Sequence, residues 1–237
     1  QLAQNKARMI ILNKAGLAED KWNAACEEYF REKGYEVVRI NSRNAGKMKS
    51  VHSVIQAACK EKIERDRKRG ILNRPVRAMV VGIPNVGKST FINSLAGKAC
   101  AKTGNKPGVT KGKQWIRLNK QVELLDTPGI LWPKFEDQSV GQKLAFIGSI
   151  KDEIVNTEDL AAELIRFMNS AYKGVLEEKY QIEGAEDPYQ LLEGIARSRN
   201  CLLKGQELDT GKAALLLLDD FRNGKLGRLT LEYPPEV

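Results

Sequence analysis

The fold of this chain is decided by the stretch Ala78-Met79-Val80-Val81-Gly82-Ile83-Pro84-Asn85-Val86-Gly87-Lys88-Ser89-Thr90. An apolar run of strand length leads into a glycine-containing loop and then into a helical pattern, and the loop matches the phosphate-loop pattern G-x-x-x-x-G-K-S/T in full. Backbone N–H groups in such a loop bind triphosphate oxygens, the lysine reaches the β- and γ-phosphates, and the serine binds Mg²⁺. We therefore expect a nucleotide site formed by Asn85, Val86, Gly87, Lys88, Ser89 and Thr90.

Length and charge limit the classes to which the chain can belong. Its 237 residues are enough for one large domain or two smaller ones. The 39 Lys and Arg residues against 30 Asp and Glu residues leave a formal charge of +9, which favours an anionic partner such as RNA; simple solubility charge is the alternative. No run is long and apolar enough to cross a bilayer, so we expect no membrane partner.

The four cysteines are scattered along the chain and form no C-x-x-C pair. This spacing predicts neither a zinc site nor a disulfide framework. Reduced thiols are typical of the cytosol, so we expect a cytoplasmic protein.

Strand and helix patterns alternate in the first part of the chain, which predicts an α/β fold with a mostly parallel sheet. Strands are expected at residues 7–12 and 35–40, and helices at 20–33 and 48–69. A basic loop at 98–113 follows the phosphate-loop helix. Residues 114–118 and 122–125 then read as a hairpin, which adds one antiparallel edge to the sheet.

From about residue 150 the strand signals nearly vanish. Asn156 is a predicted helix N-cap with acidic residues after it, and further helical patterns cover about 188–197 and 210–222. We therefore expect an α/β domain at 1–150 and an all-helical domain at 151–237.

The sequence Asp126-Thr127-Pro128-Gly129 ends a strand about forty residues after the phosphate loop. Its carboxylate can join the Mg²⁺ shell, and the Gly129 N–H can reach the γ-phosphate. Thr110, in the loop between the two motifs, is the expected second hydroxyl ligand. We predict a metal site at Ser89, Thr110 and Asp126, and catalytic roles for Lys88, Thr110 and Gly129.

Two further motifs look like the base-binding boxes of Ras-like GTPases. Asn13-Lys14 follows the first predicted strand, and Asn41-Ser42 follows the second. That resemblance implies that Asn13 supports the loop, Lys14 lies over the guanine plane, and Ser42 lies near the base carbonyl. In ordinary GTPases these boxes follow the phosphate loop, whereas here they precede it, as in the circularly permuted GTPases.

Within the permuted GTPases, three runs resemble the ribosome biogenesis GTPase A (RbgA/YlqF) family closely. They span residues 82–90, 102–110 and 124–137, and the resemblance continues into the tail at 225–229. It implies a three-layer GTPase domain in permuted order, GTP and GDP as ligands, Mg²⁺, and a K⁺ ion near Asn85. It also implies that the helical domain at 151–237 binds RNA. The expected partner is a large ribosomal subunit precursor late in its assembly, with nucleotide state controlling docking and release, and no DNA partner is expected.

The chain departs from the family pattern in three places. Gly16 stands where the guanine box normally has an aspartate, which predicts weaker guanine selection because base N–H groups lose their acceptor. Ile130 follows Gly129 where Ras-like enzymes orient water, so we expect hydrolysis that is slow alone and stimulated by the large subunit. Family members also begin with a further segment that is not in this sequence, so we expect an N-terminally incomplete version.

Basic residues in two places are our candidates for RNA phosphate contacts. The first set is Arg65, Arg67, Lys68 and Arg69, and the second is Arg222, Lys225 and Arg228. Two alternatives stay open: a nucleotide-gated RNA-binding protein with negligible hydrolysis, favoured by Ile130, and an ATP-using phosphate-loop protein, favoured by Gly16.

Overall fold

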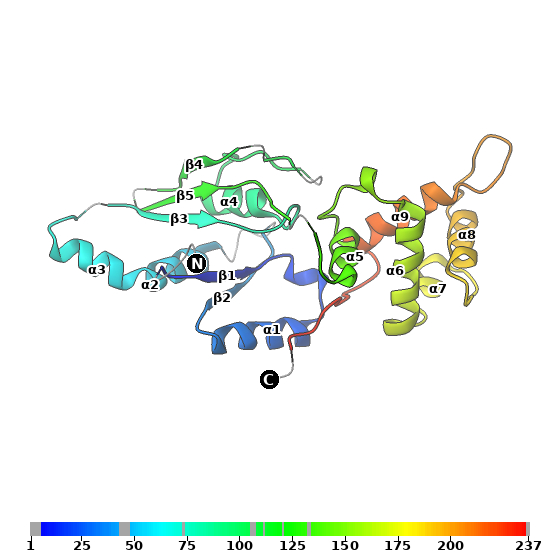
Figure 1. The fold of residues 1–237 in the computed structure, drawn as a ribbon, viewed down its shortest axis with the longest axis horizontal. Coiled ribbons are helices and arrows are strands. Elements are labelled where there is room, and N and C mark those ends of the chain that lie inside the picture. Colours follow the sequence, from blue (N-terminus) through cyan, green and yellow to red (C-terminus); the bar gives the residue numbers. More distant parts are fainter. Residues whose placement is uncertain are drawn as a thin grey trace. The chain divides into compact units, whose positions relative to one another are not determined.

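A computed structural model describes residues 6–42, 48–72, 74–104, 108–110, 112–119, 121–131 and 134–235 (Figure 1). The chain forms two compact units, one of residues 1–131 with 230–237 and the other of residues 132–229. This division differs from the predicted boundary at residue 150, because α5 (Gln138–Phe146) packs against helices of the second unit and the last residues return to the first. Residues 105–107 and 132–133 of the family-like runs lie outside the described residues.

The first unit begins with two parallel strands. Residues Ile10 and Val37 are opposite each other in this pair. The elements of this part are β1 (Met9–Leu12), the short helix η1 (Ala15–Leu17), α1 (Asp20–Glu32), β2 (Glu36–Arg39), α2 (Met48–Ala58) and α3 (Lys60–Lys68). The predicted helix over 48–69 is thus two helices that meet at Cys59, and α3 is largely exposed because its sequence has one apolar residue, Ile63.

The phosphate-loop strand belongs to a second sheet, with strand order β3-β5-β4. Strands β3 and β5 are parallel and β5 and β4 are antiparallel, which confirms the predicted hairpin. The elements are β3 (Val76–Val80), α4 (Lys88–Ala96), β4 (Gln114–Arg117) and β5 (Val122–Asp126). The described strands therefore form two sheets rather than the single sheet that we expected.

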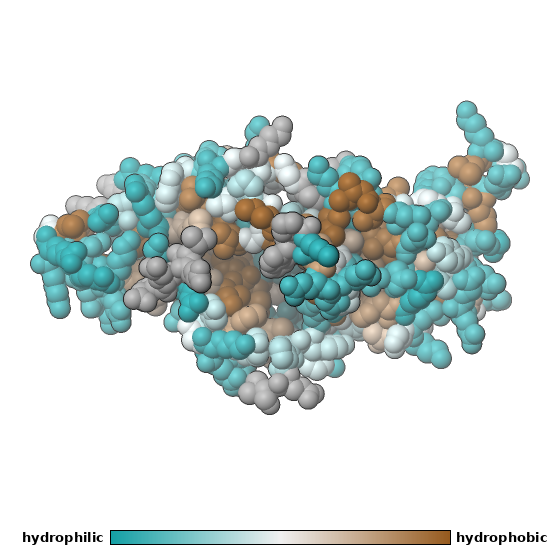
Figure 2. All heavy atoms as spheres, viewed as in Figure 1, coloured by the Kyte–Doolittle hydropathy of each residue, from teal (hydrophilic) through white to brown (hydrophobic). Residues whose placement is uncertain are grey.

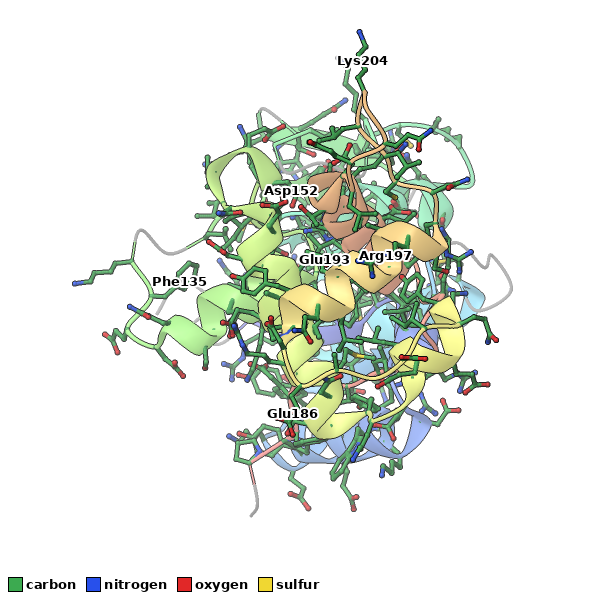
Figure 3. The ribbon with its side chains drawn as sticks, turned by 90° about the vertical axis from the view of Figure 1, so that its right-hand side faces the viewer. Phe135, Asp152, Glu186, Glu193, Arg197 and Lys204 are labelled. Carbon is green, nitrogen blue, oxygen red and sulfur yellow. The ribbon has the colours of Figure 1, made fainter. Side chains whose placement is uncertain are left out.

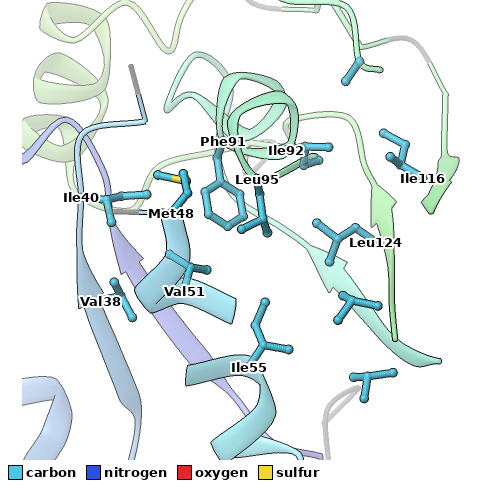
Figure 4. Close-up of a cluster of buried hydrophobic side chains, with 13 residues drawn as sticks. Val38, Ile40, Met48, Val51, Ile55, Phe91, Ile92, Leu95, Ile116 and Leu124 are labelled. Atoms are coloured by element: carbon cyan, nitrogen blue, oxygen red, sulfur yellow. The ribbon is translucent and has the colours of Figure 1, made fainter. Parts of the chain in front are cut away.

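One hydrophobic core joins the elements of the first unit. It packs β2 and α2 against α4 and the β3-β5-β4 sheet (Figure 4). Ile40 and Val51 come from the β2–α2 side, Phe91 and Ile92 from α4, and Leu124 from β5. Because α4 is held by this core, the loop before it has a fixed position at the end of β3.

The second unit is described as helices and short loops. Its elements are α5, η3 (Asp152–Ile154), α6 (Thr157–Ala171), α7 (Val175–Tyr180), α8 (Pro188–Ser198) and α9 (Thr210–Arg222). Side chains of Asp137, Asn156, Asp187 and Asp209 accept N–H bonds at the starts of α5, α6, α8 and α9. Such caps satisfy amides that have no partner inside the helix, so each start is set locally.

The face drawn in Figure 2 is mostly hydrophilic, with apolar side chains gathered in places. Met79 and Trp115 are 56% and 53% exposed, and the register of β3, β5 and β4 aligns them through Leu125. Of the helices that the structure describes, none has the length and apolar character needed to cross a membrane.

Candidate functional site

The phosphate loop joins β3 to the first turn of α4, which begins at Lys88. Gly87 caps this helix with φ 92°, a left-handed conformation that favours glycine. A Cβ at Gly87 would lie 2.4 Å from Nδ2 of Asn13, so a side chain there would displace Asn13. Gly87 therefore allows the left-handed turn before α4 and also leaves room for Asn13, a residue of the base-binding motif. Thr90 lies in the same first turn of α4.

The Lys88 ammonium folds back over the loop. Its Nζ donates to the carbonyl oxygens of Gly82 and Ile83, at 3.0 and 2.9 Å. Burial lowers the pKa of Lys88, and the nearby Asp126 carboxylate opposes that shift. A phosphate oxygen would replace these neutral carbonyl acceptors with a negatively charged one. The attraction between that charge and a partly desolvated ammonium is strong.

The side chains of Ser89, Thr110 and Asp126, the predicted metal ligands, are neighbours in the structure. The hydroxyl oxygens of Ser89 and Thr110 are 3.1 Å apart, and Ser89 Oγ donates to Asp126 Oδ2 at 3.4 Å. Asp126 is 2% exposed, and its Oδ1 has no hydrogen-bond partner among the described residues. Burial raises the pKa of Asp126, while Lys88, Ser89 and the Thr127 N–H lower it.

This oxygen set fits a Mg²⁺ ion. Two hydroxyls and one carboxylate are hard ligands, and Mg²⁺ is usually held by one or two carboxylates together with phosphates and water. The unpartnered Asp126 Oδ1 is an acceptor that a cation would satisfy. In the described part of the chain, no group of three or more His, Cys, Asp or Glu side chains could hold a metal. Phosphate oxygens of a bound nucleotide and water would complete the Mg²⁺ shell.

The loop after β5 lies directly against the phosphate loop. Thr127 Oγ1 donates to the Val80 carbonyl at 2.7 Å, which ties the two strand ends together. A Cβ on Gly129 would lie 2.6 Å from both N and Cα of Pro84, so only glycine allows this approach. The Gly129 backbone is thus close to the residues that would surround a γ-phosphate.

Asn13 links the predicted base box to the phosphate loop. Its Nδ2 donates to the Val86 carbonyl at 2.8 Å, and its Oδ1 accepts from the Ser42 N–H at 3.0 Å and the Ser42 hydroxyl at 2.7 Å. Lys14 Nζ donates to the Asn85 carbonyl at 3.0 Å. Both Lys14 (φ 54°) and Asn85 (φ 58°) are left-handed residues, and such costly conformations are concentrated at functional sites.

Gly16 leaves open space where the family pattern has a carboxylate. It is exposed, and a Cβ built on it would meet nothing within 4 Å. The backbone of this loop is held from behind, because buried Asn23 donates to the carbonyls of Ala15 and Ala18 at 2.8 and 3.3 Å. These bonds hold the loop backbone although position 16 has no carboxylate.

The structure thus gathers the predicted nucleotide residues around one loop. The base side comprises Asn13, Lys14, Ser42, Asn85, Val86 and Gly87; the phosphate side comprises Lys88, Ser89, Thr110, Asp126 and Gly129. Asn41 lies exposed beside Ser42 at the end of β2.

Three residues that support the site were not predicted from the sequence. They are Asn23, behind the base loop, Thr127, between the strand ends, and Ser94, whose hydroxyl donates to the Ser42 carbonyl at 2.5 Å. A polar residue on the buried face of a predicted helix is the signal that could have identified Asn23 and Ser94.

The basic set at the end of α3 is exposed. Arg65, Arg67, Lys68 and Arg69 form no ion pair with any residue in the described part of the chain. The second unit differs, because many of its charges are paired: Glu193 and Arg197 lie side by side on α8, 3.4 Å apart (Figure 3). The α3 set therefore remains a candidate for phosphate contacts.

Arg222 requires a correction. Its guanidinium forms two hydrogen bonds with Asp152, at 2.9 and 2.8 Å, and donates to the carbonyls of Phe146 and Ala145 at 2.9 and 2.8 Å. Only 19% of the side chain is exposed. The donors are used inside the unit, so the prediction of a phosphate contact at Arg222 is wrong. Lys225 is paired with Asp220 and Asp219, at 2.8 and 3.5 Å, and Arg228 is exposed.

Replacing Arg222 by alanine should lower the free energy of unfolding by about 2 kcal/mol, because Asp152 and two carbonyl oxygens lose their donors. Urea denaturation would measure this loss. The exposed Lys212→Ala removes the same charge and should change stability by less than about 0.5 kcal/mol. Unchanged stability in Arg222→Ala together with weaker RNA binding would contradict the structural role.

Comparisons with known proteins identify similar sequences with shared names. A family described as "50S ribosome-binding GTPase" matches residues 77–192. A Bacillus cereus protein named Ribosome biogenesis GTPase A is 46% identical over all of this chain, which covers 80% of that relative. A Thermotoga maritima protein of the same name is 31% identical over 98% of this chain and 78% of its own length.

Solved structures give the same result. The GDP-bound structure of T. maritima YlqF is 27% identical with a TM-score of 0.65, over 96% of this chain and 84% of that one. The GNP-bound crystal structure of YlqF from T. maritima is 28% identical with a TM-score of 0.65, over 97% and 82%. The phosphate loop and its associated strand ends thus occur in an α/β phosphate-loop GTPase fold, and this chain belongs to the ribosome biogenesis GTPase A family.

Proposed function

We propose that this chain is a GTP-binding and GTP-hydrolysing assembly factor of the ribosome. The observation that carries the proposal is the Asn13 side chain, which bonds to both the phosphate loop at Val86 and the second base box at Ser42. The proposed base site and the proposed triphosphate site are therefore joined by hydrogen bonds of one side chain. Because the base motifs precede the phosphate loop in the chain, we also infer a circularly permuted motif order.

The residues divide the chemistry between them. Lys88 and the loop N–H groups would bind and orient the β- and γ-phosphates, and Gly129 would donate to the γ-phosphate. Ser89, Thr110 and Asp126 would hold Mg²⁺, which neutralises charge on the phosphate oxygens when it is bound. The Asn85 side chain is our candidate for a K⁺ contact. Ile130 is 74% exposed and cannot orient water by hydrogen bonding.

We further propose that the partner is a large ribosomal subunit precursor at a late stage, and that nucleotide state controls docking and release. The loop after Gly129 continues directly into residues 132–229. Loops that bind the γ-phosphate are ordered by it and released on hydrolysis. The exposed cations of α3, together with Lys225 and Arg228, are the proposed contacts with ribosomal RNA.

The experiment is GTP turnover in K⁺ buffer with and without large-subunit precursors. We expect stimulation by the precursor, and a variant with Arg65, Arg67, Lys68 and Arg69 changed to glutamine should lose precursor affinity. Its binding should also depend less on salt, with a slope smaller by roughly 0.7–0.9 for each phosphate that is no longer bound. Lys212→Ala is the control. Equal turnover with and without precursor would favour the alternative of a nucleotide-gated binder with negligible hydrolysis.

The Gly16→Asp change tests guanine selection. It should tighten GDP binding by about 10-fold or more, because a carboxylate can accept two N–H bonds from guanine and the site has room for it. The gain should be smaller for inosine diphosphate, which lacks the 2-amino group. Gly16→Asn has the same shape without the charge and serves as control. Equal competition by ATP and GDP in the unmodified protein would favour the ATP-using alternative.

A further inference from the structure

The last described residues return to the first unit and lie against α1 (Figure 1). Thr230 is 6% exposed, and its hydroxyl oxygen accepts a hydrogen bond from the Glu19 N–H at 3.3 Å. Glu19 is the N-cap residue of α1, and its own side chain makes no cap bond there. An N–H at a helix start has no partner inside the helix, so Thr230 supplies an acceptor that α1 itself lacks.

Two more contacts continue along the same helix. The Tyr233 ring packs on the Trp22 ring, with centroids 4.3 Å apart. The Glu232 carboxylate lies close enough to Cys26 to help burial raise the pKa of that thiol. Glu19, Trp22 and Cys26 are spaced three and four residues apart, so they form one stripe of α1. Residues 230–235, which we call the tail strap, follow this stripe.

The strapped end of α1 is also the support of the base loop. Asn23, one turn after Glu19, is buried and donates to the carbonyls of Ala15 and Ala18. The loop is fixed on its other side by the Ala15 N–H, which donates to the Ile40 carbonyl at 3.1 Å. Movement of the first turn of α1 would therefore move the backbone that follows Lys14.

We propose that the tail strap is a positioning element for guanine-nucleotide binding. Thr230 and Tyr233 hold the start of α1, and the hydrogen bonds of Asn23 fix the base loop relative to that helix start. The strap touches no nucleotide itself. Gly16 offers no carboxylate to bind the base, so guanine binding depends more on the positions of Lys14 and Asn13. The strap therefore matters more here than it would in a site with an aspartate at position 16. The inference rests on the proposed base-binding role of Asn13 and Lys14.

The strap also links the first turn of α1 to residues 132–229, because it touches α1 through noncovalent contacts and its own backbone continues from residue 229. The phosphate side is connected to the same unit separately, through the loop after Gly129. The phosphate side is thus joined to residues 132–229 by the chain itself, and the base side is joined to them through the contacts of the strap with α1.

The test uses the full chain and GDP. Tyr233→Ala and Thr230→Val should each weaken GDP binding by about fivefold, as expected if the competent loop is populated one-fifth as often. GTP should weaken by the same factor, because the strap acts on the base side. Thr230→Ser keeps the hydroxyl and should bind like the unmodified protein. Tyr189→Ala, which removes another half-exposed tyrosine in the helical unit, is the matched control.

A purely structural strap would give a different result. It would lower the melting temperature while leaving the GDP affinity measured far below that temperature unchanged, and that result would overturn the proposal. By reciprocity, GDP should also slow amide hydrogen exchange at Glu19 if it favours the strapped state. Lys14→Ala distinguishes failure of the strap proposal from failure of the base-box assignment. If Lys14→Ala also leaves GDP affinity unchanged, the base-box assignment fails. If Lys14→Ala weakens GDP binding but the strap variants do not, only the strap proposal is overturned.

Discussion

Replacement of Lys88 by alanine is expected to lower kcat for GTP hydrolysis by about 100- to 1000-fold, the usual effect of removing one preorganised charge from a transition state. The ammonium is held in place by the carbonyls of Gly82 and Ile83, and its partial burial lowers the pKa of Lys88. A charge in such surroundings acts on a phosphate more strongly than a charge in water. Single-turnover hydrolysis in the presence of Mg²⁺ would measure the loss.

The matched control is Lys98→Ala, an exposed lysine just beyond α4. It removes the same formal charge without touching the phosphate loop, so turnover should stay within about twofold of the unmodified protein. A loss of similar size in both variants would mean that overall charge, and not the position of Lys88, controls turnover. The assignment of Lys88 to the phosphates would then be wrong.

The second large effect is expected from Gly87→Ala, which should weaken binding of both GDP and GTP by roughly 100-fold. The new Cβ would lie 2.4 Å from the Asn13 amide nitrogen, far closer than two such atoms can approach, and the backbone there has φ 92°. Relief requires either displacement of Asn13, which breaks its bonds to Val86 and Ser42, or a change in the loop that binds phosphate. Strain of about 1–3 kcal/mol together with the broken hydrogen bonds gives this magnitude.

Gly16→Ala is the control for Gly87→Ala. It makes the same chemical change in the same site, but its Cβ would meet nothing within 4 Å. Nucleotide affinity, measured by fluorescence titration, should therefore change by less than about twofold. If Gly87→Ala bound GDP as well as Gly16→Ala does, the contact between the base box and the phosphate loop would have no energetic importance.

Local patterns in the sequence predicted most of the elements. The strand before Gly82, the helix start at Lys88 and the hairpin of β4 and β5 all follow from short-range signals, namely apolar runs, glycine positions and turn residues. The helices α5 and α7 were not predicted. Both are short, with nine and six residues, so their apolar periodicity is weak, although Asp137 is a cap signal for α5.

The division of the chain and the role of Arg222 could not be read from the sequence. An arginine in the last turn of a helix looks the same whether its charge is solvated or bound, and the Asp152 that binds it is 70 residues away. The same holds for the tail strap, which shows no helix or strand pattern of its own. Long-range contacts of this kind depend on packing, and packing leaves no local signature in the chain.

For the nucleotide site, the sequence and the tertiary structure contributed different information. The sequence alone determined which residues are the candidates for the chemistry, because phosphate, Mg²⁺ and base binding each require particular residue types at fixed spacings. Only the tertiary structure decided that Asn13 reaches Val86 and that Thr110 meets Ser89, since these pairs are 73 and 21 residues apart. The physical reason is that a common core holds β2 and α4 together, and the loops at their ends are brought into hydrogen-bonding distance by that packing.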